Sequence, residues 1–269
     1  MKKTIIYLID LNTNQVLPLY EFGLVAGFPS PAQDYAAASI DLNVALMLDA
    51  DNTRIIKVKD DDLAGVHIYE GDFAIIATDL VAGKGDKIFC CLNGENMNRI
   101  VEVDKTHPHI ILTSTNEKIL PVKIHPDTDC IVNGVITYTI TPHIPSKFYP
   151  NGKTKGTVDI NKLLIANKAS TFLGFINGDS MTEAAIHNGD IAIIDKSLPY
   201  IDGFKALCQI RDLFTIKFLE WDKKEKDTLW LKPANKEFPP IKVEKDESVK
   251  VWGVVTYTIT PHTRKFNIL

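Results

Sequence analysis

The sequence predicts a mainly β protein made of two tandem copies of one domain, and three observations support this. The segment 132–143 returns as 251–262, at an offset of 119 residues and with two substitutions. Short runs rich in Val, Ile, Phe and Thr lie between Gly, Asn and Asp turns, which is typical of strands. The 269 residues, 45% hydrophobic and 24% charged, suit two globular domains of ordinary size.

The repeat extends upstream of the nearly identical segment. Asp41-Leu42-Asn43 corresponds to Asp159-Ile160-Asn161, and Glu70-Gly71-Asp72 corresponds to Asn188-Gly189-Asp190, both at an offset of 118. A unit of this length is too long for a solenoid repeat and indicates a duplicated globular domain. The Pro-, Gly- and Lys-rich residues 145–156 are typical of a linker between the copies.

Each copy is predicted to open with one short helix and to continue as strands. The helices are expected over 41–48 and 159–168, where Asp41 and Asp159 can cap the first free amides. Because strands do not alternate with helices, a doubly wound sheet is disfavoured. The predicted strands are 54–59, 73–78, 87–92, 109–113 and 130–141 in the first copy, and 171–176, 191–194, 206–211, 214–219, 228–231 and 249–259 in the second.

Composition excludes several classes of protein. The net charge of −4 argues against a protein that neutralises many phosphates, and therefore against DNA binding through a basic face. The four cysteines form neither a disulfide framework nor a C-x-x-C site, which favours buried thiols in a reducing compartment. There is no run of 18 apolar residues and no signal-peptide pattern, so we predict a cytoplasmic protein without a membrane segment.

Two polar positions distinguish the copies. Ser180 corresponds to Asp62, and Lys217 corresponds to Arg99, and the members of each pair are 37 positions apart. A neutral lysine amine can take the proton of a serine hydroxyl if burial lowers the pKa of the amine, and Lys217 lies among apolar residues. Arginine stays protonated and aspartate has no hydroxyl, so only the second copy carries a candidate dyad.

Five segments together resemble the LexA/UmuD family of self-cleaving Ser-Lys peptidases. In the second copy they are Gly178-Asp179-Ser180-Met181, the turn Asn188-Gly189-Asp190, and Phe214-Thr215-Ile216-Lys217. Near the N-terminus they are residues 26–35, AGFPSPAQDY, and Ile40-Asp41-Leu42-Asn43. The resemblance runs once through each copy, and the segment 26–35 is its most specific part.

The resemblance implies the chemistry and the partners. Ala26-Gly27 is expected to be the scissile bond, Ser180 the nucleophile and Lys217 the general base, with the backbone amides of Ser180 and Met181 as oxyanion hole. No metal or cofactor is implied. Members of the family cleave themselves when stimulated by a RecA filament on single-stranded DNA. Since 26 residues are too few for a helix-turn-helix domain, the UmuD branch is favoured, with a UmuC-like translesion polymerase as partner and no sequence-specific DNA binding.

The chain departs from that family in joining two UmuD-like domains. We expect an intramolecular pseudo-dimer, in which the arm of the first copy reaches the dyad of the second. The repeated final strands are expected to form a shared pairing surface between the domains, although each strand taken alone fits a core strand equally well. Whether two pseudo-dimers associate is left open. The expected division is a cleavable N-terminal arm at 1–26, a degenerate domain at 27–143, a linker at 144–158 and a competent domain at 159–269.

Less specific interpretations remain beside this one. Residues 80–83 repeat the tetrapeptide Leu-Val-Ala-Gly of 24–27, but we expect them to form only a hairpin connection. His107 and His109 lack partners at metal-ligand spacing, so a solvated loop is favoured over a metal site. Two alternative functions are an interaction module with a vestigial peptidase site, and a Ser-Lys peptidase that acts on other substrates.

Overall fold

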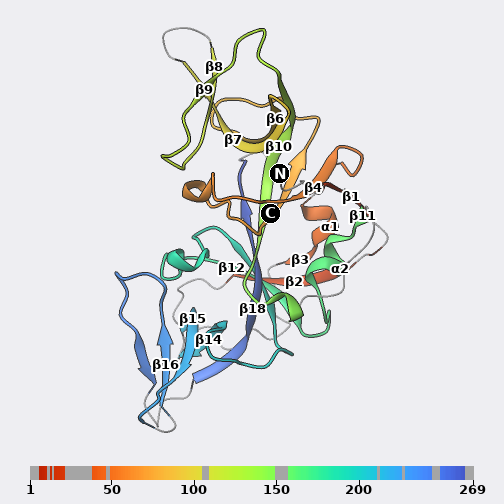
Figure 1. Ribbon diagram of the computed structural model, residues 1–269. Helices are drawn as coiled ribbons and strands as arrows, with labels where there is room; N and C mark the ends of the chain where they lie inside the picture. The colour runs from red at the N-terminus through yellow and green to blue at the C-terminus, as the bar shows by residue number, and fades with distance from the viewer. Residues whose placement is uncertain are drawn as a thin grey trace.

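The computed structural model describes residues 6–10, 13, 15–21, 38–46, 49–104, 109–148, 157–210, 213–225, 228–243 and 249–263. It confirms a mainly β fold in two copies, with each copy at one end of the molecule and the longest strands crossing its centre (Figure 1). The segment before the first copy holds β1 (Ile6–Ile9) and β2 (Val16–Glu21). The first copy holds β3 (Ala38–Asp41), α1 (Leu42–Ala45), β4 (Thr53–Lys57), β5 (Phe73–Ala77), β6 (Lys87–Leu92), β7 (Glu95–Val103), β8 (Ile110–Thr113), β9 (Val122–Lys123) and β10 (Cys130–Pro142). The second holds β11 (Thr157–Val158), α2 (Ile160–Leu164), β12 (Thr171–Phe175), β13 (Ile191–Asp195), β14 (Lys205–Ile210), β15 (Leu213–Trp221), β16 (Leu229–Lys232), β17 (Ile241–Val243) and β18 (Val249–Pro261).

The two copies have the same strand order. In the first, antiparallel pairing gives β4-β5-β10-β6-β7-β8-β9, and in the second it gives β12-β13-β18-β14-β15-β16-β17. Each long final strand pairs with two strands in turn, and its register shifts at a bulge beside a repeated glycine. A Cβ on Gly134 would lie 2.8 Å from the Ala77 oxygen, and one on Gly253 would lie 2.7 Å from Ile194 Cγ2. Glycine is therefore required where the strand bends.

The copies are related by a pseudo-twofold axis through the β10–β18 pair. In this antiparallel ladder Ile140 lies opposite Ile259, and these two residues are equivalent in the repeat. Both side chains are fully buried. The ladder is flanked by two equivalent hydrogen bonds of 2.8 Å, between His143 Nε2 and Thr258 Oγ1 and between His262 Nε2 and Thr139 Oγ1. The prediction that the repeated final strands form the pairing surface is confirmed.

The two short helices lie side by side near the axis (Figure 1). Asp41 caps α1 by accepting from the Asn43 amide, and Asp159 caps α2 by accepting from the Lys162 amide, as predicted. Each capping aspartate also accepts a hydrogen bond from the other copy. Asn43 Nδ2 donates to Asp159 at 3.1 Å, and Asn161 Nδ2 donates to Asp41 at 2.9 Å. Both helices are shorter than the predicted 41–48 and 159–168.

Strands β1 and β2, which the sequence analysis did not predict, lie within the segment expected to be an arm. β1 runs antiparallel to β4 and parallel to β11, whereas β2 runs parallel to β12 and antiparallel to β3. The segment before the expected scissile bond therefore contributes two strands, each of which pairs with strands of both copies. The predicted linker also contains structure, since it holds the 3-10 turn Ser146–Phe148 and β11, while residues 149–156 lie outside the described part.

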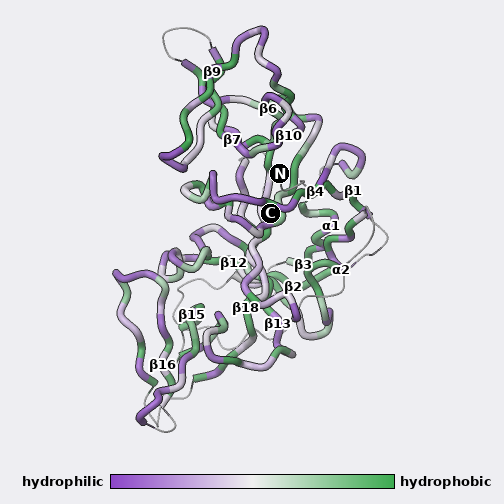
Figure 2. Tube along the Cα trace, viewed as in Figure 1, coloured by the Kyte–Doolittle hydropathy of each residue, from purple (hydrophilic) through white to green (hydrophobic). Residues whose placement is uncertain are grey.

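One hydrophobic core spans the axis. It combines residues of both copies with Leu17 and Leu19 of β2, all buried. Apolar segments accordingly gather along the central strands and the two helices, whereas the outer hairpin ends are hydrophilic (Figure 2). Separate smaller clusters fill the interior of each copy, around Phe172 and Leu207 in the second and around Ile56 and Phe89 in the first. β2 therefore contributes buried side chains to the core that the two copies share.

Candidate active site

Ser180 and Lys217 meet in the second copy. Ser180 lies in the turn between β12 and the 3-10 turn Thr182–Ala184, and Gly178 enters this turn with a φ of +123°, which favours glycine. Lys217 lies in the middle of β15, opposite Ala206 of β14. The Lys217 Nζ is 2.7 Å from the Ser180 Oγ. The sequence-predicted pair is therefore within hydrogen-bond distance across 37 residues of chain.

The amine of Lys217 is buried, and its side chain is only 5% exposed. Burial lowers the pKa of Lys217 from 10.5 to about 8, because removal from water disfavours the charged form. Two further acceptors orient the amine, Thr215 Oγ1 at 2.6 Å and the Ile216 oxygen at 3.0 Å. Sequence reasoning gave Thr215 no role, although residues two apart on a strand share a face, and this spacing was the available signal.

The turn that carries Ser180 is held by the β16–β17 connection. The Ala234 amide donates to the Ser180 oxygen at 2.9 Å, and Asn235 Nδ2 donates to the Asp179 oxygen at 2.9 Å. Within the part of the chain that the structure describes, the amides of Ser180 and Met181 donate to no backbone oxygen. Both residues line the cleft beside the Ser180 hydroxyl.

A cleft of about 70 Å³ opens beside Ser180. Its walls come from the end of β12, the Ser180 turn, β14 and the start of β15. The lining residues are mostly apolar: Phe175, Ile176, Asn177, Gly178, Ser180, Met181, Ile186, Leu207, Phe214, Thr215 and Ile216. A narrow apolar cleft that runs on from a strand end suits an extended peptide with small or apolar side chains.

The equivalent place in the first copy holds an ion pair instead of a dyad. Arg99 Nη1 is 2.7 Å from Asp62 Oδ2, and it also donates to the Asn98 oxygen at 2.6 Å. That second bond is the counterpart of the one from Lys217 to the Ile216 oxygen. The Arg99–Asp62 pair therefore lies where the second copy has Lys217 and Ser180, and it offers neither a hydroxyl nor a lysine amine.

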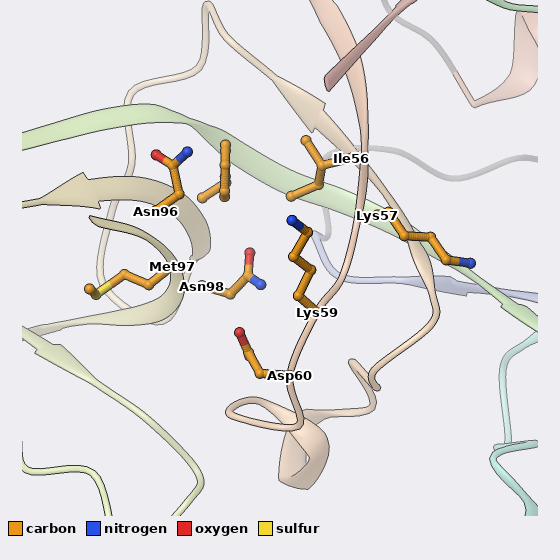
Figure 3. Close-up of a pocket in the computed structure, with 8 residues that line it drawn as sticks. Ile56, Lys57, Lys59, Asp60, Asn96, Met97 and Asn98 are labelled. Carbon is orange, nitrogen blue, oxygen red and sulfur yellow. The ribbon is translucent and has the colours of Figure 1, made fainter. Parts of the chain in front are cut away.

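The cleft next to this ion pair has also changed. It measures about 200 Å³, and Lys59, Asp60, Asn96 and Asn98 surround it while Lys57 points away (Figure 3). The repeat aligns Asn96 and Asn98 with Phe214 and Ile216, so polar side chains have replaced the apolar wall. The first copy thus lacks both the Ser-Lys pair and part of the apolar lining that the second copy has.

The scissile bond expected at Ala26-Gly27 lies outside the described residues. The duplicate tetrapeptide at 80–83 lies between β5 and β6, where Val81 is 89% exposed and the Gly83 amide donates to Asp86 at 2.7 Å. It is an exposed connection, but the prediction of a hairpin is wrong, because β5 and β6 each pair with β10 and not with each other.

For the other candidate features, the described residues give three observations. They contain no group of three or more His, Cys, Asp or Glu side chains arranged to hold a metal ion. Of the two histidines considered for a metal, His107 falls outside them and His109 lies near His125. Their helices are all too short or too polar to span a bilayer.

Comparison with known proteins agrees with this arrangement. A family described as Peptidase S24-like matches residues 18–137 and again residues 140–256. Protein MucA of Salmonella typhimurium is 31% identical over 112 residues, which are 41% of this chain and 74% of MucA. Protein SamA of Salmonella typhimurium is 31% identical over 103 residues, 38% of this chain and 69% of SamA. The LexA repressor of Clostridium tetani is 36% identical over 91 residues, 34% of this chain and 44% of the repressor. Since the two family matches cover most of the chain, one for each copy, the protein belongs to the Peptidase S24 family of LexA and UmuD, with the family's domain present twice.

Proposed function

We propose that this protein is a self-cleaving serine peptidase of the DNA-damage response, which cuts its own Ala26-Gly27 bond with the Ser180–Lys217 dyad. The family match and the relatives named MucA, SamA and LexA repressor support the class of activity. The 2.7 Å contact between the two side chains and the lowered pKa of Lys217 support the dyad.

The observation that carries the proposal is the register of β2 on β12. The two strands run parallel, with Glu21 opposite Phe175. Ala26 follows Glu21 by five residues, and Ser180 follows Phe175 by five residues. β2 therefore points toward the end of β12 that leads to Ser180, and five residues can span at most about 17 Å, which supports the proposal that the bond reaches the nucleophile.

The proposed reaction is an acyl transfer followed by hydrolysis. The neutral Lys217 amine takes the Ser180 proton as Oγ attacks the carbonyl carbon of Ala26, and the amides of Ser180 and Met181 stabilise the oxyanion. The resulting ammonium returns the proton to the Gly27 nitrogen, which leaves as an amine. Water, deprotonated by Lys217, then hydrolyses the Ala26 ester of Ser180 and restores the hydroxyl.

The domain roles follow from this reaction. Residues 1–26 are the segment that is cut off, 27–143 the degenerate domain, 144–158 the linker and 159–269 the catalytic domain. A RecA-type filament on single-stranded DNA is the proposed stimulus, and the cleaved protein is proposed to regulate a UmuC-like translesion polymerase in the cytoplasm. The relationship to the LexA and UmuD family supports these two partners.

Intact-mass measurement of the purified chain at alkaline pH, and with RecA filament, tests the proposal. Fragments 1–26 and 27–269 are expected. Ser180→Ala and Lys217→Ala should each abolish them, and Asp62→Ala, the matched change in the other copy, should leave them unchanged. Cleavage at another bond would contradict the assigned site. An intact chain under every stimulus, with polymerase binding retained, would indicate an interaction module, and cleavage of an added peptide in trans would indicate other substrates.

A further inference from the structure

The segment on the N-terminal side of the proposed scissile bond is built into the folded protein. β2 fills a slot between β12 of the second copy and β3 of the first, with backbone pairing on both sides. β1 fills a second slot, between β4 and β11. Breaking the peptide bond at 26–27 removes none of these pairings.

Side chains anchor β2 in its slot. Leu17 and Leu19 are fully buried and join the hydrophobic core that both copies share. Tyr20 is 5% exposed on the opposite face and meets Phe172 edge to face, with 5.5 Å between the ring centres. Val16 on the same strand is 40% exposed. The slot therefore selects an extended segment with apolar side chains at set positions.

The connection between β1 and β2 is fixed by polar contacts at the pseudo-twofold axis. The Thr13 oxygen accepts from Asn43 Nδ2 at 3.0 Å and from Asn161 Nδ2 at 3.3 Å, one donor from each copy. The Thr13 hydroxyl donates to Asp159, and the Gln15 amide donates to Asp41 at 2.9 Å. These contacts pair buried or half-buried polar groups that would lose their partners if the segment left.

We propose that residues 1–26, once cut, stay bound as a peptide ligand, and that the slot between β12 and β3 is a binding site for an extended peptide with the apolar pattern of β2. This inference rests on the proposed cleavage between β2 and β3. The cut thus changes the segment from a covalent part of the fold into a non-covalent, exchangeable strand. The immediate product is a two-chain complex.

The test makes the nick without using the dyad. A recognition sequence for an unrelated site-specific protease is inserted after Gly27 in the full chain carrying Ser180→Ala, and the folded protein is cut under native conditions. We expect the N-terminal fragment to co-elute with the remainder in size-exclusion chromatography at micromolar concentration and to separate only in denaturant. Separation in native buffer would overturn the proposal. Because the added protease makes the cut, this result does not depend on whether the wild-type chain cleaves itself.

Two matched variants locate the bound strand. Exchange of the fragment against excess isotope-labelled 1–26 peptide is followed by intact mass. Leu19→Ala, which truncates a buried side chain of β2, should speed fragment loss at least about tenfold, while Val16→Ala, which truncates an exposed one, should change it by less than about twofold. Equal exchange rates for both variants would show that the fragment is held elsewhere, and would overturn the assignment of the slot.

Discussion

The pH dependence of self-cleavage follows directly from the setting of Lys217. The base must be neutral, and burial lowers its pKa from 10.5 to about 8. At pH 7 this raises the neutral fraction roughly 300-fold over that of a solvated lysine, and still leaves only about one amine in ten neutral. The rate should therefore rise about tenfold per pH unit from pH 6 to near 8, and level off above pH 9.

The assay is the first-order loss of intact chain, measured by mass at fixed temperature and ionic strength between pH 6 and 10. Lys205 is the necessary control, because burial lowers its pKa to about 8 as well, and its amine bonds His143 at 2.7 Å and the Ala184 oxygen at 2.9 Å. Lys205→Arg removes that titration but keeps a cation. A flat profile, a midpoint above pH 10, or a midpoint that disappears in Lys205→Arg would refute the assignment of Lys217 as the base.

Three further predictions concern the division between the copies. The double change Asp62→Ser and Arg99→Lys should rebuild a Ser-Lys pair in the first copy of a chain that lacks the Ser180 hydroxyl. Intact mass should nevertheless show no fragment, because β1 runs antiparallel to β4 and leads no scissile segment toward that pair. Ile140→Ala should lower the free energy of unfolding by about 2–4 kcal/mol in urea titration, because it opens a cavity in the fully buried axis of the β10–β18 ladder. Burial raises the pKa of Asp190 to about 6, above its unfolded value. The free energy of unfolding should therefore fall as pH rises from 4 through 6, because the buried carboxyl must then ionise in the folded state. Asp190→Asn should accordingly raise the melting temperature relative to wild type more at pH 8 than at pH 5.

The repeat made the fold largely predictable. Comparing the copies identified the final strand as the shared surface and the dyad as the point of divergence, and both Asp caps were found at their predicted residues. β7 was missed although its counterpart over 214–219 was predicted. Its sequence, ENMNRIVEV, lacks the apolar alternation of β15, because this strand lines a polar cleft rather than the catalytic one.

The pairing of β1 and β2 could not be predicted from the sequence. Runs such as Val16–Glu21 carry an apolar pattern, but that pattern does not say which copy a strand joins or in which direction it runs. Strand direction is set by long-range contacts, here the shared core around Leu17 and Leu19 and the Thr13 contacts at the axis.

If the proposed function holds, strand direction also explains why only one copy carries the Ser-Lys pair. In the second copy the neighbouring strand β2 is parallel to β12 and leads toward the Ser180 turn, whereas in the first the neighbouring strand β1 is antiparallel to β4 and leads away from the equivalent turn. A dyad beside β4 would meet no scissile segment, so the Arg99–Asp62 pair there removes no activity. The contacts that hold the two copies together are made by residues that occur in both. Asp41 and Asn43 are equivalent to Asp159 and Asn161, and β10 is equivalent to β18. The copies thus differ at the Ser-Lys positions, where the first copy has no strand leading toward them, and they share the residues that position β2.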